Sequence, residues 1–260
     1  MTLLNFLRHD MYKFFGFILI SVLLNVSLSS CKSDNSGSKK KVVVDPNKQS
    51  EFDNLVSAID ASPATDSSVS LRFENDEFQQ KQLSLFLYEN IGCTKWILDE
   101  QKKDGSKRTV SFYFNKGKLF HSSEITFSDN SVRQTNSYYN EKMEGVYSSE
   151  RRSENYLDLE SSSLKPVNFI KHNIKESMDI KDAVGIYAPK FIGLINFKGI
   201  DFIRVGQKEN GGFWTDLVVP EMTDSIKKLE KSKPGTPLKI IFKIKTINGF
   251  DHQVIETISY

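Results

Sequence analysis

Short segments in which apolar and polar residues alternate recur about every ten residues between residues 67 and 160. Alternation puts every second side chain on the same face of a strand, and clusters of Gly, Asn and Asp separate several segments as turns do. The 19 Phe and nine Tyr residues of the chain suit the half-buried faces of such strands. The pattern predicts an antiparallel β-meander with one polar face and one aromatic and aliphatic face. The clearest turns are Lys103-Asp104-Gly105, Asn115-Lys116-Gly117 and Asp129-Asn130.

An amphipathic helix is predicted before the meander. Apolar residues recur at positions i, i+3, i+4 and i+7, which is the stripe of a helix that buries one side. These residues are Phe52, Leu55, Val56 and Ile59. Asp45-Pro46 suits the start of the helix and Ser62-Pro63 its end. Residues 47–160 are therefore predicted to form one domain, a helix followed by the meander.

The order of predicted elements after residue 160 indicates a second domain. A serine-rich stretch that ends in Pro166 predicts a linker over residues 161–179. Residues 180–260 then show three strands, a helix capped by Thr223, and two further strands. An OB-fold has this order of elements, and "KPGTPLKIIFKIKT" resembles its fourth strand. The resemblance implies a small five-stranded OB-like barrel with one helix, with a generic β-sandwich or an α+β sheet as the alternative. The predicted fold class of the whole chain is mainly β (α+β).

Residues 1–30 have the arrangement of a secretory signal peptide. Arg8 and Lys13 precede an apolar run from Phe14 to Leu24, and small residues follow it. A run of about eleven residues is too short to cross the hydrocarbon core of a bilayer, which takes about 20 residues of helix. The segment therefore predicts a signal peptide and not a membrane-spanning helix.

The end of this segment, Leu28-Ser29-Ser30-Cys31, resembles the bacterial lipobox, in which a Leu and two small residues precede a required Cys. The resemblance implies that Cys31 receives a diacylglycerol, that a lipoprotein signal peptidase cuts before it, and that Cys31 becomes the acylated first residue of the mature protein. Two acyl chains hold a protein stably to a bilayer, so the membrane is the partner implied for Cys31. An ordinary cleaved signal with a free Cys31 and a retained anchor are the alternatives.

Residues 31–46 are polar, basic and serine-rich, which predicts a flexible tether between the membrane and the folded part. Lys32 and not Asp follows Cys31, and in some bacteria this argues against retention in the inner membrane. The implied location is the bacterial cell envelope, with the outer membrane favoured over the inner.

Signatures of catalysis or cofactor binding are absent from the sequence, which has no P-loop, dinucleotide glycine pattern, HExxH, CxxC or GxSxG. With Cys31 acylated, Cys93 has no disulfide partner, and its apolar neighbours predict a buried thiol and not a nucleophile. His121, His172 and His252 lie far apart in the sequence, and a metal site would need the fold to join His172 and His252. We therefore predict no catalytic residue, no metal site and no cofactor.

Two acidic pairs, Asp99-Glu100 and Asp158 with Glu160, resemble the paired carboxylates of glycosidases. On a strand the adjacent Asp99 and Glu100 would point to opposite faces, where they would not act together. Asp158 and Glu160 would share the wet face of a half-buried strand, with leucines on the other face. The pattern favours structural roles, and a hydrolase that acts on an envelope polymer through convergent carboxylates is the alternative function.

The OB-like part offers one candidate binding site. In "FWTDLVV", Trp214 alternates with a more apolar set of residues and would face outward. On the neighbouring strand, Phe202 and Arg204 share one face. The resemblance to an OB-fold implies that strands two and three hold an oligonucleotide or oligosaccharide there. We predict Trp214, Phe202 and Arg204 as ligand-binding residues, and the alternative is that Trp214 belongs to the core.

The charge of the chain favours no polyanionic partner. Its net charge is only +2, from 35 basic and 33 acidic residues of interspersed sign, whereas nucleic-acid binders concentrate their basic residues. The stripe of Lys239, Lys243 and Lys245 alternates with apolar residues, which is typical of a solvent-facing strand protected against edge pairing. The sequence thus predicts a lipid-anchored, non-enzymatic envelope protein that binds or scaffolds, with another envelope protein or a glycan as its partner.

Overall fold

A computed structural model describes residues 46–209 and 211–260. The predicted signal peptide, Cys31 and all of the predicted tether except its last residue lie outside these residues. The described chain is mostly β, with an eight-stranded sheet, a five-stranded sheet and few helices. The predicted α+β class is therefore confirmed.

Helix α2, Pro46–Ala61, confirms the predicted N-terminal helix and ends directly before Ser62-Pro63. The chain divides into two compact units just after this helix, between Pro63 and Ala64. Helix α2 belongs to the unit that ends at Pro63, and Ala64–Tyr260 form a second unit that contains both sheets.

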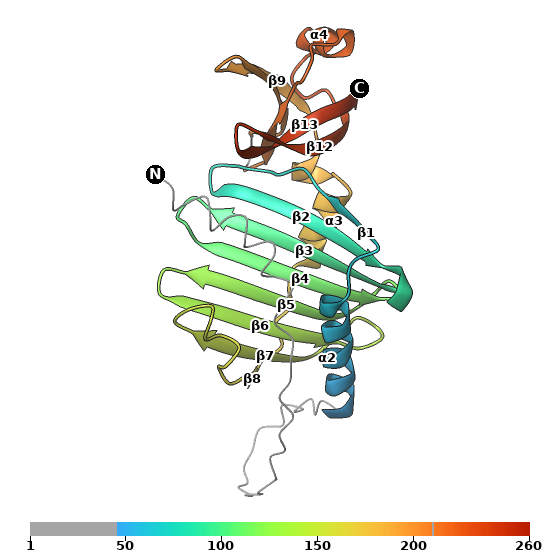
Figure 1. Ribbon diagram of the computed structural model, residues 1–260, viewed down its shortest axis with the longest axis vertical. Coiled ribbons are helices and arrows are strands. Elements are labelled where there is room, and N and C mark those ends of the chain that lie inside the picture. Colours follow the sequence, from blue (N-terminus) through green and yellow to red (C-terminus); the bar gives the residue numbers. More distant parts are fainter. Residues whose placement is uncertain (1–45, 210) are drawn as a thin grey trace, which may run out of the picture. The chain divides into compact units, whose positions relative to one another are not determined.

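The strands of the first sheet follow the order of the chain, and each pairs antiparallel with its sequence neighbours (Figure 1). This is the meander that the alternating segments predict. The predicted turns at Gly105 and Gly117 place these glycines at φ 91° and 75°, where a side chain would be strained. The short helix η1, Glu89–Ile91, links β2 to β3. The strands are β1 Asp66–Val69, β2 Phe78–Tyr88, β3 Cys93–Lys102, β4 Lys107–Asn115, β5 Lys118–Ser128, β6 Ser131–Tyr139, β7 Gly145–Ser153 and β8 Lys165–Val167.

Register partners on neighbouring strands form rows across one face of this sheet. Leu83, Leu98 and Val110 form one such row on β2, β3 and β4, and all three are fully buried. The next row of side chains lies two residues away along each strand and therefore on the same face. It begins with Lys81 and Glu100. One face of the sheet thus carries an apolar row directly beside a charged one.

The segment "NYLDLES" does not form the predicted half-buried strand, so that prediction is wrong. Strand β7 ends at Ser153, and residues 154–162 form bends and turns. Asn155 explains the difference: its Oδ1 accepts from the Asp158 N–H at 3.0 Å, and its Nδ2 donates to the Asp158 carboxylate at 2.5 Å. Such local side-chain bonds compete with strand pairing. Asp158 and Glu160 therefore lie on a turn and not on one face of a strand.

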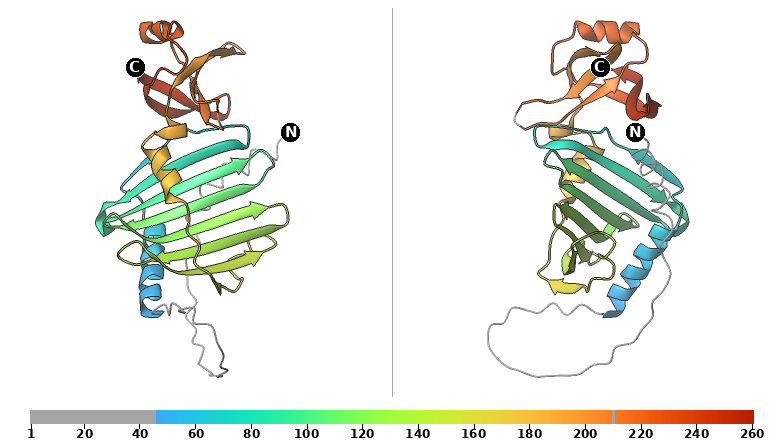
Figure 2. Two further views of the ribbon diagram at one scale, coloured as in Figure 1. Left: turned by 180° about the vertical axis from the view of Figure 1, so that it is seen from behind. Right: turned by 60° about the vertical axis from the view of Figure 1, so that its left-hand side comes forward.

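Residues 161–179, predicted as a linker, contain secondary structure. Strand β8 pairs with β7 at the end of the sheet, and helix α3, Ile174–Lys181, lies across one face of the meander (Figure 2). The short helix η2, Gly185–Tyr187, then leads into the second sheet.

The five-stranded sheet has the spatial order β12–β13–β11–β10–β9. Its neighbours pair antiparallel except β11 and β13, which pair parallel at Val218 and Val254. Helix α4, Asp224–Glu230, stands between the third and fourth strands, and the Thr223 side chain caps it by accepting from the Ile226 N–H. The predicted sequence of three strands, a helix and two strands is confirmed. The strands are β9 Phe191–Phe197, β10 Ile200–Gly206, β11 Trp214–Val218, β12 Lys239–Ile247 and β13 Phe250–Ser259.

The two sheets share one hydrophobic cluster. Glu74, between β1 and β2, exchanges both backbone hydrogen bonds with Trp214 of β11, at 2.7 and 2.9 Å. In the same cluster the Tyr187 ring stacks on the Phe213 ring with 4.9 Å between their centres, and it meets the Phe73 ring edge-on at 5.3 Å. Backbone pairing and aromatic packing therefore join the two sheets.

A buried lysine holds several elements together at the joint of the two sheets, the region where Glu74 pairs with Trp214 and Tyr187 packs on Phe213. Lys81 extends from β2, is 3% exposed, and places its Nζ 2.7 Å from Glu100 Oε1 on β3 and 2.5 Å from Glu176 Oε1 on α3. The same Nζ lies 4.2 Å from the centre of the Phe78 ring and 4.9 Å from that of Phe213, which are cation–π distances. One ammonium group thus contacts both sheets and the helix between them.

Removing the Lys81 ammonium is expected to destabilise the second unit strongly. Lys81→Met keeps much of the aliphatic side chain but leaves Glu100 and Glu176 without their shared cation. We expect a loss of about 3–5 kcal/mol in the free energy of unfolding, measured by urea denaturation.

Lys175→Met is the matched control. Lys175 is an exposed lysine on α3 that pairs with Asp179 four residues later, and such a pair contributes at most about 0.5 kcal/mol. Equally small losses in the two variants would show that the buried charge does not hold the unit together.

Candidate functional site

The three predicted ligand-binding residues lie on one face of the five-stranded sheet. Arg204 of β10 is the register partner of Asp216 on β11. Phe202 lies two residues before Arg204 on the same strand. Gly206 lies two residues after Arg204, and its register partner is Trp214. Because a strand rises about 3.3 Å per residue, Phe202 and Trp214 stand at opposite ends of a row, on the order of 13 Å apart. We call this row the β10–β11 face. The fold therefore aligns the three residues but does not bring them into one cluster.

The centre of the β10–β11 face is a two-pronged ion pair. Arg204 Nε donates to Asp216 Oδ1 at 2.7 Å and its Nη2 to Oδ2 at 2.6 Å. The hydrogen bonds to Asp216 raise the pKa of the Arg204 guanidinium above its ordinary value. Both side chains remain partly exposed, so the pair adds little stability. Its geometry, however, holds both groups in a fixed orientation.

Trp214 stands at the joint of the two sheets. The residues on either side of it, Phe213 and Thr215, are buried, while Trp214 itself is half-buried, which fits the predicted alternation. Its indole N–H donates to Glu74 Oε1 at 2.7 Å, and Lys208 Nζ lies 6.0 Å from the ring centre. The ring edge is therefore bound to the segment before β2. At the other end of the row, Phe202 lies 6.5 Å from the ring centre of His252.

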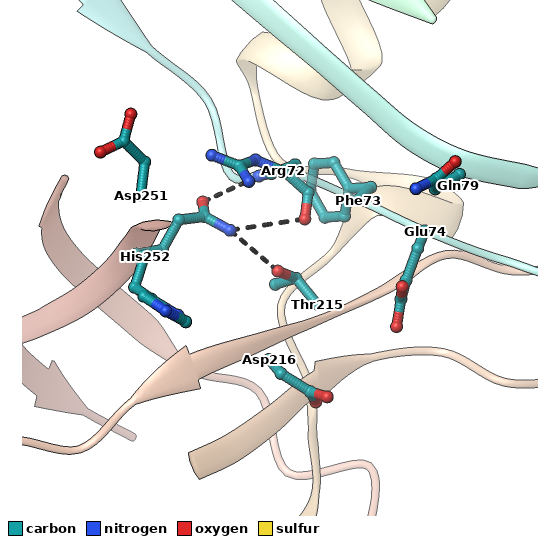
Figure 3. A pocket seen from close by; sticks show the side chains of 9 residues that line it. Arg72, Phe73, Glu74, Gln79, Thr215, Asp216, Asp251 and His252 are labelled. Carbon is teal, nitrogen blue, oxygen red and sulfur yellow. Dashed lines mark hydrogen bonds between the residues drawn. The ribbon is translucent and has the colours of Figure 1, made fainter. Parts of the chain in front are cut away.

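A pocket of about 170 Å³ adjoins the middle of this face. Figure 3 shows that side chains from β2 and the segment before it, from β11 and from β13 surround it. We call it the β11–β13 pocket. It is lined by Arg72, Phe73, Glu74, Gln79, Thr215, Asp216, Asp251, His252 and Gln253.

The Gln253 side chain fixes one wall of the β11–β13 pocket. Its Oε1 accepts from the Arg72 N–H at 2.8 Å, and its Nε2 donates to Thr215 Oγ1 at 3.0 Å. Gln253 lies 181 residues from Arg72 in the sequence. No local pattern marks such a partner, which is why the sequence did not predict this side of the site.

One N–H donor of Arg72, a residue that lines the pocket, has no partner among the described residues. Its Nε is buried and has no hydrogen-bond partner, and among the described residues its guanidinium forms no ion pair. The carboxylates nearby are engaged: Glu74 accepts from Trp214, Asp216 from Arg204, and Asp251 accepts from the Thr246 hydroxyl at 2.7 Å. A carboxylate can accept several hydrogen bonds, so these groups still offer acceptors to a polar ligand, and Arg72 offers donors.

The acidic residues that do converge are held by cations. Glu100 and Glu176 both contact Lys81, and Arg108 Nη1 donates to Glu100 at 2.8 Å. Burial raises the pKa of Glu176, but hydrogen bonds from Lys81 and Tyr187 outweigh it and leave that pKa below its ordinary value. A lowered pKa keeps Glu176 ionised at neutral pH, so Glu176 does not supply the acid that glycoside hydrolysis requires.

Asp99 lies on the opposite face of β3 from Glu100, as strand alternation predicts. Its carboxylate accepts from the Thr109 hydroxyl at 2.7 Å, and burial raises its pKa. The two members of this acidic pair are therefore directed at different neighbours.

A serine and a histidine meet in the interior of the meander. Ser122 Oγ lies 2.7 Å from His172 Nδ1 and 3.1 Å from the Tyr139 hydroxyl. Ser122 and His172 are 0% and 2% exposed, so solvent does not reach the pair. His252 lies on β13 beside Phe202, and within the described chain no three His, Cys, Asp or Glu side chains gather as metal ligands would.

Cys93 is buried, as predicted, and burial raises the pKa of its thiol. A raised pKa keeps the sulfur protonated at neutral pH, and the thiol is a poor nucleophile compared with the thiolate.

Comparison with protein-family models, with curated proteins and with solved structures finds no match to this chain. Over residues 46–209 and 211–260, no helix has both the length and the apolar character needed to span a membrane.

The buried His172 is expected to make folding sensitive to acid. Burial lowers its pKa to about 4, although attraction to Glu124 opposes the shift, whereas an unfolded histidine has a pKa of about 6.5. Between these values only the unfolded chain binds the proton, so stability falls as pH falls through this window, by about 1.4 kcal/mol per pH unit for this residue.

Urea denaturation at several pH values between 7 and 4 measures this slope. His172→Asn keeps a hydrogen-bonding group near the Nδ1 position but does not titrate, so its stability is expected to depend less steeply on pH. An unchanged slope in His172→Asn would contradict the assignment.

Proposed function

We propose that the protein is a lipid-anchored, non-enzymatic binding protein of the bacterial cell envelope, and that its ligand is a glycan. The observation that carries the proposal is the β10–β11 face, where two aromatic rings flank the Arg204–Asp216 pair beside the β11–β13 pocket. Aromatic side chains offer apolar faces to a sugar ring, and the fixed polar groups between them match its hydroxyls.

The charges around the pocket support a glycan over a nucleic acid. Glu74, Asp216 and Asp251 all line the pocket, and three carboxylates repel the phosphates of a polyanion. The Arg72 guanidinium, which forms no ion pair within the described chain, has N–H donors that suit hydroxyl and carbonyl oxygens. Another envelope protein is the second partner that the exposed row would accommodate.

The alternative function, hydrolysis of an envelope polymer, has less support. Glu100 and Glu176 converge, but Lys81 pairs with both of them. The second acidic pair lies on the 154–162 turn, where the Asp158 carboxylate is bonded to Asn155. Binding without chemistry therefore accounts better for the arrangement of the acidic side chains.

The anchor in this proposal rests on the sequence. The lipobox-like Leu28-Ser29-Ser30-Cys31 ends a short apolar segment, and two acyl chains on Cys31 would hold the protein at the membrane. The outer membrane is the favoured location, with the polar residues 31–46 as a tether between the bilayer and the folded units.

Glycan binding is tested by screening the protein on an array of bacterial glycans and titrating the strongest binder by calorimetry. Phe202→Ala and Arg72→Gln are each expected to weaken binding about tenfold, which corresponds to about 1.4 kcal/mol. Phe169→Ala removes an exposed aromatic ring that packs on Tyr139 of the eight-stranded sheet, outside the pocket lining, and is expected to change nothing. A protein that binds no glycan, or equal losses in Phe169→Ala and Phe202→Ala, would refute the proposal.

The anchor is tested by growing expressing cells with a fatty-acid probe and following the label on the protein. Cys31→Ala is expected to abolish labelling. Cys93→Ala removes the other cysteine of the chain and is expected to keep the label in full. Retention of the label in Cys31→Ala, or no label on the wild type, would exclude acylation of Cys31.

A further inference from the structure

A second cavity, of about 270 Å³, lies on the charged part of the eight-stranded sheet. Liquid water takes about 30 Å³ per molecule, so this cavity has room for several waters or for a small polar group with part of its carrier. We call it the β3–β6 cavity. It is lined by Phe78, Glu100, Lys102, Ser106, Lys107, Arg108, Glu124, Thr126 and Arg133.

The lining of the β3–β6 cavity has four cationic and two anionic side chains, a formal charge of +2. The two carboxylates lie deep: the Glu100 and Glu124 side chains are 5% and 13% exposed, whereas Arg133 is 41% exposed. Arg108 occupies both of them, with Nη1 2.8 Å from Glu100 and Nε 2.9 Å from Glu124. A ligand that enters from solvent therefore meets mainly the positive groups.

Strand register places an uncharged hydroxyl between two guanidinium groups. Thr126 on β5 is the register partner of Arg108 on β4 and of Arg133 on β6. Neighbouring strands lie about 4.8 Å apart, and register partners share a face. The three side chains therefore form one row across the cavity, and the Thr126 hydroxyl makes no hydrogen bond within the described chain.

Arg108 uses its donors on Glu100 and Glu124, but the donors of Arg133 are available. The closest carboxylate oxygens to Arg133 are 3.7 Å away on Glu124 and 3.8 Å away on Glu150, which is beyond hydrogen-bond distance. All five N–H donors of its guanidinium are thus available. Lys107, at the start of β4, is exposed, and it lies one residue before Arg108, so its side chain points to the other face of the strand.

We propose that the β3–β6 cavity binds a phosphate group, as free phosphate or as a phosphomonoester, through Arg133 and Thr126. An arginine fork matches two phosphate oxygens at once. A phosphomonoester carries a charge of about −1.5 to −2 at neutral pH, which balances the +2 of the lining. A monocarboxylate carries half of that charge and matches the site less well.

This site is independent of the proposed glycan site. The β11–β13 pocket is lined by Glu74, Asp216 and Asp251, so a phosphate group would be repelled there. Loss of glycan binding in Phe202→Ala therefore says nothing about the phosphate site, and the two proposals fail separately.

The test titrates the full chain, purified in detergent, with inorganic phosphate, with glycerol 3-phosphate and with acetate, and follows binding by calorimetry. We expect at least one of the phosphates to bind at least tenfold more tightly than acetate. Preference for inorganic phosphate identifies the free anion as the ligand, and preference for glycerol 3-phosphate identifies an esterified phosphate.

Two variants locate the site. Arg133→Gln, at a side chain that makes no hydrogen bond with the residues that the structure describes, is expected to weaken phosphate binding at least tenfold. Lys245→Gln removes the same charge from the exposed surface of β12 and is expected to change binding less than twofold. Binding of neither phosphate, or equal losses in Arg133→Gln and Lys245→Gln, would overturn the proposal.

Discussion

The rest of the second unit depends on one buried charge, the ammonium of Lys81. It contacts Glu100 and Glu176 at 2.7 and 2.5 Å and lies over the rings of Phe78 and Phe213. A buried cation costs several kcal/mol unless its partners surround it, so strand β3, helix α3 and the five-stranded sheet must all be in place at once. The hydroxyl of Tyr187 donates to the same Glu176 oxygen at 2.6 Å and completes this arrangement.

Both cavities owe their position to this joint. The pairing of Glu74 with Trp214 and of Gln253 with the backbone of Arg72 brings the segment before β2 against β11 and β13. The β11–β13 pocket opens there, among three carboxylates, whereas the β3–β6 cavity opens over the charged row that continues from Lys81 and carries the opposite charge. The two cavities therefore suit different chemical groups.

The sequence predicted the features that depend on a few neighbouring residues. Helix α2, the meander, the Thr223 cap and the outward position of Trp214 all follow from spacing or capping within one segment. The Asn155 turn was missed because alternation alone does not weigh a side chain that bonds to its own backbone. Lys81, Gln253 and the row of Arg108, Thr126 and Arg133 were missed because their roles depend on the register between strands. Periodicity within one strand does not contain that information.

Hydrogen exchange of individual backbone amides in native buffer tests the joint most directly. The amides of Glu74 and Trp214 bond to each other's carbonyls across the two sheets, at 2.7 and 2.9 Å. If the buried charge makes the second unit one cooperative structure, these two amides exchange only through global unfolding, as slowly as the amides of Val110 and Leu217 in the two sheet interiors. Exchange of the Glu74 and Trp214 amides orders of magnitude faster, with Val110 and Leu217 still protected, would mean that the sheets separate while each stays folded. That result would contradict the account.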